Sequence, residues 1–276
     1  MGTLTEATRL TAADRGFVVE LDPAWEGWAP AGGYLAAIAL RAVGLSVPEG
    51  HRPVTLSAQF LAKAERGTAV IRVDVGKPGG SSQVNVSLWQ LERCFFQAQI
   101  WTTSRSFGPH EIGPAMPEVP AAAGLETLEA HFRRLGRELV TFWANLECRP
   151  VEFRAPGGPR PRTRRLQRWY QFRHEPATAD IFANAGRVAV LIDANIWAAH
   201  WRMLDREPDY AGPSLDLTIA FHDAAVLSDW LLLDAESEVA IHGIVHATGR
   251  VWTVEGRLVA TGAGNCLVVP FRPVEK

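Results

Sequence analysis

The residue of this sequence best suited to chemistry is an aspartate in an apolar segment. Asp193 lies in the run VAVLIDANIW, where most neighbours are apolar. A carboxylate in such surroundings is partly desolvated, which raises its pKa and its value as a proton acceptor. The plainer alternative is that Asp193 caps a break in a helix or faces solvent. Because a buried aspartate is rarely left without a partner, we favour a functional carboxylate.

Two adjacent glycines before another apolar run offer a different kind of chemistry. Gly32 and Gly33 precede YLAAIALRAV, which begins at Tyr34. Without intervening side chains, the N–H groups at a helix N-terminus can approach a ligand, and the helix dipole favours negative charge there. Gly32, Gly33 and Tyr34 are therefore candidate substrate-binding residues near an oxyanion site. A tight turn into the helix is the simpler interpretation and is slightly favoured.

Other common catalytic patterns are missing from the sequence. His242 and His246 in HGIVH would lie ~13 Å apart along a strand, which is too far for one metal ion. The H-E-x-x-H zinc pattern and the G-x-S-x-G segment of α/β-hydrolases do not occur. Cys94, Cys148 and Cys266 lie far apart, and no pair has metal-ligand spacing. We therefore expect no metal ion and no cofactor.

Two similar series of elements must position these residues. In the first half, residues 16–21 form a predicted strand and residues 34–43 a buried helix. Period-two alternation then predicts strands over 54–62, 68–75, 82–90 and 94–103.

The second half repeats this order with a longer helix. We expect a helix over 125–148, strands over 150–154 and 166–174, and a long apolar helix over 178–202. Four more strands are predicted over 214–221, 230–238, 240–251 and 258–269. Because each half places a buried helix before a run of antiparallel strands, the pattern predicts an internally duplicated α+β fold.

A proline-rich segment separates the two halves. Residues 107–124 contain Pro109, Pro114, Pro117 and Pro120, so they cannot form a regular helix or a central strand. We expect an N-terminal unit over 1–106, a linker over 107–124 and a C-terminal unit over 125–276 that carries the catalytic residues. The PGGPRPR stretch within 155–163 marks a further loop.

Composition narrows the class of protein. The chain has 276 residues, 47% of them hydrophobic, and a net charge of −2, so it lacks the positive field that nucleic-acid binders need. No uncharged apolar run reaches the length of a membrane-spanning helix, and residues 1–15 lack the apolar core of a secretory signal. An odd number of cysteines suggests a reducing compartment, so we expect a cytoplasmic location. Ten tryptophans suit a large apolar interior or an apolar ligand cleft.

The ordered set of segments resembles the double hot-dog acyl-CoA thioesterases of the acyl-CoA thioesterase II type. The resemblance covers nearly the whole chain, and its most characteristic part is the final strand pair, GRVW-x-x-EGRLVA. The other matching segments are GGYLAAIAL, TLSAQFL, VDVGKPGGSSQVNVSLWQ, CFFQAQIWTTS, AVLIDANIW, PSLDLTIAFH and WLLLDAES. The fold that this implies is an α+β double hot-dog, in which each unit packs a long buried helix against a curved antiparallel sheet.

The resemblance also implies an activity, namely hydrolysis of an acyl-CoA thioester to free acid and CoA. In that family a water is held by an aspartate on the second long helix, a hydroxyl residue at the start of the next strand and a glutamine on the last strand. Local matching places the first two on Asp193 and Ser214. Asp193 would accept the proton of the water and Ser214 would fix its direction. A serine after Pro213 could instead merely close a turn.

The glutamine position falls on Gly264, which is a departure from the family pattern. Strand alternation would point Asn265 to the opposite face unless a bulge intervenes, and Asn195 lies about 200° around the helix from Asp193. One outcome is a slower or differently tuned hydrolase, in which Asp193, Ser214 and backbone groups alone hold the water. The other is a protein that binds acyl thioesters without turning them over efficiently.

A third alternative is a hot-dog hydratase or dehydratase. The sequences of such enzymes typically have a paired aspartate and histidine on the loop that enters the long helix. The segments AWEGWAPAGG and HEPATADIFA supply this pair poorly, although His174 and Asp180 keep the alternative open.

The expected partners follow from the same resemblance and from the charge pattern. Seven arginines between positions 154 and 173 could hold the CoA phosphates, but a solvated basic loop is the favoured interpretation. These are Arg154, Arg160, Arg162, Arg164, Arg165, Arg168 and Arg173. Exposed strand edges of a hot-dog sheet favour a homodimer or a larger homo-oligomer. We expect an acyl-CoA partner from lipid metabolism, no nucleic acid and no membrane span.

Overall fold

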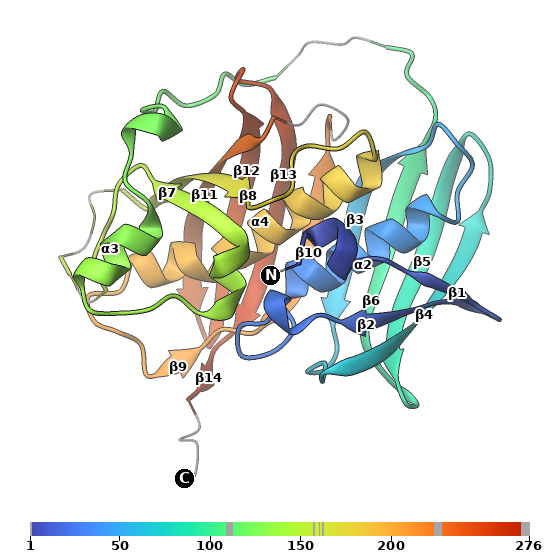
Figure 1. Ribbon diagram of the computed structural model, residues 1–276, viewed down its shortest axis with the longest axis horizontal. Coiled ribbons are helices and arrows are strands. Elements are labelled where there is room, and N and C mark those ends of the chain that lie inside the picture. The colour runs from blue at the N-terminus through green and yellow to red at the C-terminus, as the bar shows by residue number, and fades with distance from the viewer. Residues whose placement is uncertain are drawn as a thin grey trace.

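A twelve-stranded antiparallel sheet wraps around two central helices (Figure 1). The computed structural model describes residues 2–108, 113–156, 158–159, 161, 163–223 and 228–271. The strand order in the sheet is β1-β2-β4-β5-β6-β3-β10-β13-β12-β11-β8-β7. The first half of the chain supplies one side of the sheet and the second half the other, and the two meet where β3 pairs with β10. This is the α+β double hot-dog arrangement that the sequence predicts.

The strands mostly follow the predicted alternation. In the first half they are β1 (Thr11–Ala13), β2 (Gly16–Leu21), β3 (Arg52–Phe60), β4 (Gly67–Lys77), β5 (Ser81–Gln90) and β6 (Arg93–Thr103). In the second half they are β7 (Leu146–Pro150), β8 (Arg165–Phe172), β10 (Ser214–Phe221), β11 (Trp230–Ile241), β12 (Ile244–Thr253) and β13 (Leu258–Leu267). A separate two-stranded sheet pairs β9 (Tyr210–Ala211) with β14 (Val269–Pro270).

Two of the helices are long, and the others are short connecting pieces. The long ones are α2 (Gly32–Gly44) and α4 (Ile181–Arg202), close to the predicted bounds. The short pieces are α1 (Leu4–Ala7), α3 (Leu128–Arg134) and the 3₁₀ turns η1 (Pro23–Trp25), η2 (Ala122–Gly124) and η3 (Thr141–Asn145). Within the described part of the chain, no helix is long and apolar enough to cross a membrane.

The helix predicted over 125–148 is wrong. Within this range only α3 is an α-helix, because Gly136 adopts a φ of 67° and ends the helix after two turns. Residues 146–150 already belong to β7, so the strand predicted over 150–154 begins where the observed strand ends. The apolar residues of this segment pack against η1, β7 and β8, as in the contacts of Phe142 with Trp25 and of Trp143 with Tyr170, and do not form a helical stripe of their own.

Small residues let α2 and α4 cross closely. A Cβ atom on Gly33 would lie 2.5 Å from Val190 Cα, and one on Gly186 would lie 3.0 Å from Ala37 Cβ. Because α4 contacts α2 on one side and strands of the sheet on others, nearly all of its surface is buried, which explains why its sequence is apolar all round. The crossing brings the first turn of α2 against the middle of α4.

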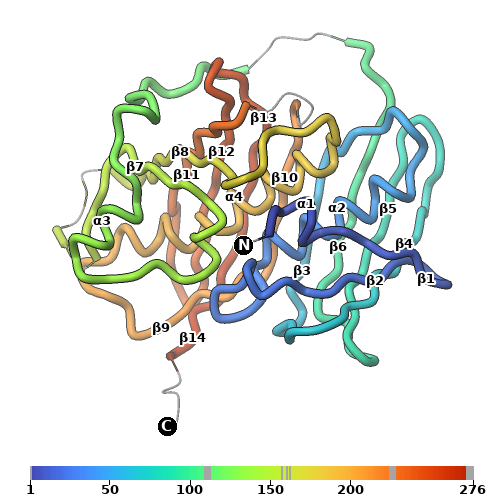
Figure 2. Tube along the Cα trace, in the orientation of Figure 1, coloured from blue at the N-terminus to red at the C-terminus, as the bar shows by residue number. Residues whose placement is uncertain are grey.

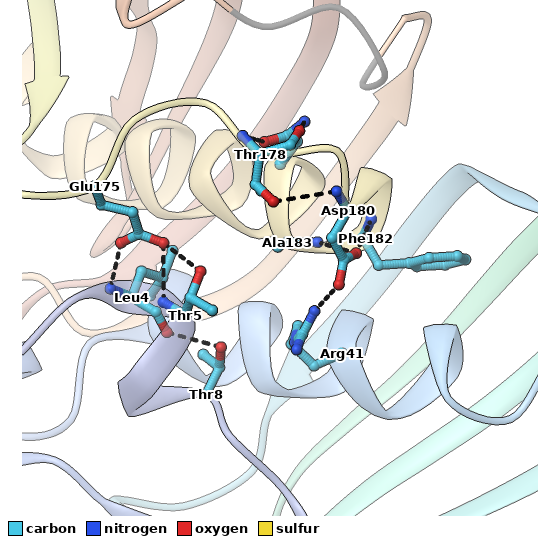
Figure 3. Close-up of polar contacts among 10 residues, drawn as sticks. Leu4, Thr5, Thr8, Arg41, Glu175, Thr178, Asp180, Phe182 and Ala183 are labelled. Carbon is cyan, nitrogen blue, oxygen red and sulfur yellow. Dashed lines mark hydrogen bonds and ion pairs between the residues drawn. The ribbon is translucent and has the colours of Figure 1, made fainter.

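Polar contacts fix the other end of this helix pair (Figure 3). Asp180 caps α4 by accepting hydrogen bonds from the N–H groups of Phe182 and Ala183, at 2.9 and 3.0 Å, and it also pairs with Arg41 of α2. Glu175, on the loop before α4, accepts hydrogen bonds from the backbone N–H groups of Leu4 and Thr5. These contacts tie α1, α2 and the start of α4 together.

The described segment that precedes α3 runs from beside the β12–β13 end of the sheet down to α3 (Figure 2). Trp169 and Trp252 point outward from the sheet and pack against Ala122, Met116 and Val119. The indole N–H of Trp169 donates a 2.9 Å hydrogen bond to Pro120 O. The described part of the proline-rich segment is therefore packed on the sheet and does not hang free between the two halves.

Candidate functional site

Asp193 and Ser214 meet at the first turn of α2. Ser214 Oγ donates a 2.9 Å hydrogen bond to Asp193 Oδ1, and the N–H of Gly33 donates a 2.7 Å bond to Oδ2. Asp193 lies one turn after Val190 on the side of α4 that faces α2, which is why the helix crossing delivers it to this position. The carboxylate therefore caps a helix from the other half of the chain.

A β-bulge aims Ser214 at the aspartate. Ser214 and Asp216 of β10 lie opposite Cys266 and Asn265 of β13. These two partners are consecutive, so β10 has one more residue than β13 between the two pairs. Without the extra residue, Ser214 and Asp216 would share one face of the sheet. With it, Ser214 faces Asp193 inside, while Asp216 accepts hydrogen bonds from the Asn265 side chain at 2.8 and 3.1 Å.

Burial raises the pKa of Asp193, and the hydrogen bonds from Gly33 and Ser214 oppose part of that rise. The side chain is buried, and no cationic side chain lowers its pKa. A carboxylate held in this way has free lone pairs and an increased affinity for a proton. It is therefore suited to accept a proton from a bound water.

Cys266 is a neighbour of this pair that the sequence interpretation did not include. It lies opposite Ser214 on β13 and is almost fully buried. Burial raises the pKa of its thiol to about 12, and the nearby Asp193 charge adds to the rise, while a hydrogen bond with Ser214 lowers it. The thiol is therefore neutral at neutral pH. The sequence contained one signal for this neighbour, because Cys266 lies two residues after Gly264 and therefore on the same face of the strand.

Gly264 faces α4, and its position leaves little room for a side chain. A Cβ atom there would lie 2.9 Å from Asp216 O and 3.4 Å from Ile196 Cγ1. Neither Asn265 nor Asn195 supplies the amide that a glutamine at position 264 would provide. Asn265 is bonded to Asp216 on the outer face, and Asn195 accepts a 2.8 Å hydrogen bond from the Tyr170 hydroxyl.

The three candidates at the start of α2 have different surroundings. The N–H of Gly33 is bonded to Asp193, and its missing side chain permits the helix crossing. Gly32 is half-buried, and a Cβ atom there would lie 2.8 Å from the Phe60 ring and 2.9 Å from Asp193 Oδ1. The absence of a side chain at Gly32 therefore leaves space beside the carboxylate.

Tyr34 does not belong to the site. It is fully buried, its hydroxyl donates a 2.8 Å hydrogen bond to Ala7 O, and it accepts one of 3.1 Å from Asp22 N. A phenol with both roles satisfied inside the core cannot reach a substrate. Its role is to hold the N-terminal segment against α2.

The arginines of the basic segment do not form one cluster. Arg165 pairs with Asp234, and Arg173 pairs with Glu129. Arg164 is exposed and donates to Glu238 O, whereas Arg168 points inward toward α4. Arg160 and Arg162 lie outside the described residues. The described members of the set therefore have separate structural surroundings, and none of them lies within hydrogen-bonding distance of Asp193 or Ser214.

The aspartate–histidine pair of a hydratase does not form. The carboxylate of Asp180 is engaged in capping α4 and in the ion pair with Arg41, and no hydrogen bond joins it to His174, which the structure also describes. Likewise, the described part of the chain holds no group of three or more potential metal ligands.

Comparisons with known proteins agree with this architecture. A model of the acyl-CoA thioesterase N-terminal domain matches residues 21–103, and one of the acyl-CoA thioesterase C-terminal domain matches residues 116–268. No curated protein sequence matches the chain.

Several solved structures share the fold over almost the whole chain. A hot dog fold protein of unknown function from Alicyclobacillus acidocaldarius has a TM-score of 0.81 and 20% identity, with 98% of each chain covered. The tesB protein of Mycobacterium avium subs paratuberculosis has a TM-score of 0.78 and 22% identity, with 97% of this chain and 98% of that chain covered. Acyl-CoA thioesterase II TesB2 from Mycobacterium marinum has a TM-score of 0.74 and 18% identity over the same shares. With family models matched in both halves, the chain belongs to the acyl-CoA thioesterase family.

Proposed function

We propose that this protein hydrolyses an acyl-CoA thioester by a water that Asp193 activates. The observation that carries the proposal is the buried Asp193 carboxylate held between Gly33 N–H and the Ser214 hydroxyl. Because Ser214 donates its own hydrogen to Asp193, its oxygen can accept a hydrogen bond from the water. A water bound to both side chains has its attacking lone pair directed away from them, toward a thioester carbonyl.

The proposed reaction needs few groups because a thioester is already an activated ester. As the water attacks the carbonyl carbon, its proton passes to Asp193. The tetrahedral intermediate then loses its C–S bond, and the proton held by Asp193 passes to the departing CoA sulfur. The products are the free acid and CoA, and the carboxylate is restored.

A hydrolysis assay over a series of acyl-CoA chain lengths tests this proposal. We expect Asp193→Asn to lower kcat by about 10²- to 10⁴-fold, because the amide keeps the shape but cannot accept the proton. Ser214→Ala should cost roughly 10- to 100-fold through loss of a charge-assisted hydrogen bond. Asp216→Asn is the matched control, since this carboxylate faces away from the site, and it should keep the wild-type rate. Equal rates for wild type and Asp193→Asn would refute Asp193 as the base.

Gly264 supports a second candidate function, the binding of acyl thioesters without efficient turnover. No side chain at this position completes the hydrogen bonds of the water, and Asn265 and Asn195 are engaged elsewhere. Measurable binding of acyl-CoA by wild type, with no turnover at any chain length, would favour this candidate over hydrolysis.

A further inference from the structure

A cavity of about 420 Å³ lies beside α4, on a different side from α2. Its walls come from α4, α3, η3 and the strands β7 and β8. Aromatic and aliphatic side chains dominate the lining, among them Phe132, Leu139, Trp143, Phe153 and Trp201. The size and the apolar lining are those of a small-molecule binding site.

Three arginines and three glutamates interrupt the apolar lining of this cavity, namely Arg154, Arg168, Arg202, Glu138, Glu152 and Glu207, and Arg168 has the poorest set of partners among the arginines. On β8, Leu166 and Tyr170 point into the core, and Arg168 lies between them on the same face. Its Nε is buried without a hydrogen-bond partner, and Nη1 has only distant contacts of 3.4 Å to Tyr170 Oη and to Asn195 Oδ1. No carboxylate among the described residues pairs with it, and the groups that raise its pKa are the Tyr170 phenol and the Cys148 thiol.

The other two arginines in the lining are engaged. Arg202 pairs with Glu152, and Arg154 donates to backbone carbonyls that include Arg202 O at 2.7 Å. Arg168 therefore differs from both. A guanidinium in largely apolar surroundings is costly unless it is paired, so a bound anion would give Arg168 the partner that the described residues do not supply.

The cavity reaches the neighbourhood of the candidate catalytic pair. Ala194, which follows Asp193, and Trp197, one turn farther along α4, both line it. The ring of Trp197 lies against Gly212, where a Cβ atom would be only 2.1 Å away, and Gly212 is two residues before Ser214. Neither Asp193 nor Ser214 lines the cavity itself, and Ala194 and Trp197 are the lining residues that adjoin them in the chain and at Gly212.

We propose that this cavity receives the acyl group of the substrate and that Arg168 binds a carboxylate at the far end of that group. The preferred substrate is then an ω-carboxyacyl thioester, the CoA ester of a dicarboxylic acid. The apolar walls contact the methylene chain, and the planar guanidinium binds the terminal carboxylate with two hydrogen bonds. This inference rests on the proposed function, because it assumes that the thioester carbon lies at Asp193.

Matched substrates test this specificity. Acyl-CoA esters of equal chain length, with either a methyl or a carboxylate terminus, are compared by kcat/KM. We expect wild type to prefer the carboxylate series by roughly 10- to 100-fold and Arg168→Met to lose this preference while still hydrolysing the methyl series. Arg164→Met is the control, since it removes an equal charge from an exposed position, and it should keep the preference. An equal preference in wild type and Arg168→Met, or none in wild type, would overturn the proposal.

Binding measurements separate this proposal from the proposed function. Non-hydrolysable thioether analogues with the two termini are titrated into wild type, Arg168→Met and Arg168→Lys by calorimetry, and circular dichroism verifies that each variant is folded. Selective loss of binding for the carboxylate analogue in Arg168→Met supports the inference even if no hydrolysis occurs, and Arg168→Lys should retain part of the selectivity. An equal loss for both analogues would assign Arg168 to the CoA moiety and overturn the inference.

Discussion

At the scale of single residues, Asp193 has a structural role beside its proposed chemical one. Its carboxylate caps α2 through Gly33 and holds Ser214, so one side chain links the two halves of the molecule and orients the candidate catalytic hydroxyl. The plainer alternative considered from the sequence applies in part, because the aspartate is a helix cap, but for a helix of the other half, and its catalytic role stays a proposal. The arrangement places a carboxylate of raised proton affinity where the two halves meet.

The raised pKa of Asp193 predicts a pH dependence of the proposed activity. The base must be ionised, so kcat/KM should increase with pH through a value above the ordinary range of an aspartate and level off above it. The same shift means that the folded state binds this proton more tightly than the unfolded state. The free energy of unfolding of wild type should therefore fall relative to Asp193→Asn as the pH rises through this window. Rate profiles and denaturant titrations over pH measure both, and a flat rate profile would contradict the assignment.

Gly264 yields a second prediction at this scale. Because an added Cβ would lie 2.9 Å from the backbone Asp216 O, Gly264→Ala should lower the free energy of unfolding by about 1–3 kcal/mol. Gly264→Gln has the same steric conflict, so it should not simply restore a faster enzyme. Gly249→Ala is the control, because the nearest atom to its added Cβ would be 3.7 Å away. Equal stability of the two alanine variants in urea unfolding would show that the strand adapts freely.

At the scale of elements, the close crossing of α2 and α4 determines the site. Gly33 allows the backbones to approach, and this approach brings its N–H to the carboxylate one turn beyond Val190. Packing and chemistry thus depend on the same small residue. The bulge in β10 is the second element-level feature, since it aims Ser214 inward while Asp216 faces outward.

Replacement of Gly33 tests the helix crossing. A Cβ at this position would be 2.5 Å from Val190 Cα and 2.8 Å from Ala189 O, so backbone atoms would have to move. We expect Gly33→Ala to lower the free energy of unfolding by about 3 kcal/mol and to reduce hydrolysis by displacing Asp193. Gly27→Ala, where nothing lies within 4 Å of the added Cβ, should be nearly neutral in both measurements. A stable and fully active Gly33→Ala variant would contradict this account of the crossing.

At the scale of the whole molecule, one sheet continues across both halves, and the segment between them is packed on its outer face. We retain the division into units over 1–106 and 125–276 as a proposal about organisation. The described part of the connecting segment, however, shares a small apolar cluster with Trp169 and Trp252 of the C-terminal side. The two halves also share the site, since Gly33 comes from one and Asp193 from the other.

The hydrogen bond between Trp169 and Pro120 tests the contribution of this packing. Trp169→Phe removes the indole N–H that donates to Pro120 O, and we expect a loss of about 1 kcal/mol in the free energy of unfolding. The segment before α3 should also become more susceptible to limited proteolysis. The control is Trp28→Phe, because Trp28 is 63% exposed. If both variants unfold and are cleaved like wild type, the connecting segment contributes little to stability.

The sequence by itself determined the general fold and the candidate catalytic carboxylate. Alternation of apolar residues predicted most strands, and the two apolar runs predicted α2 and α4, because these patterns report which faces are buried. An aspartate inside such a run was recognisable for the same reason. The segment over 125–148 was misjudged because its apolar residues belong to short pieces of structure, α3 and η3, that pack against η1, β7 and β8.

Only the tertiary structure decided which groups meet. Periodicity indicates that a residue is buried but not which partner it contacts, so the bond between Gly33 and Asp193, 160 residues apart, could not be derived from local pattern. A single extra residue in β10 changes which side chains share a face, and this is what turns Ser214 toward the aspartate. The same limit applied to Tyr34, whose hydroxyl is engaged by the N-terminal segment, and to Arg168, whose position in the cavity depends on α4 and η3 packing against β8.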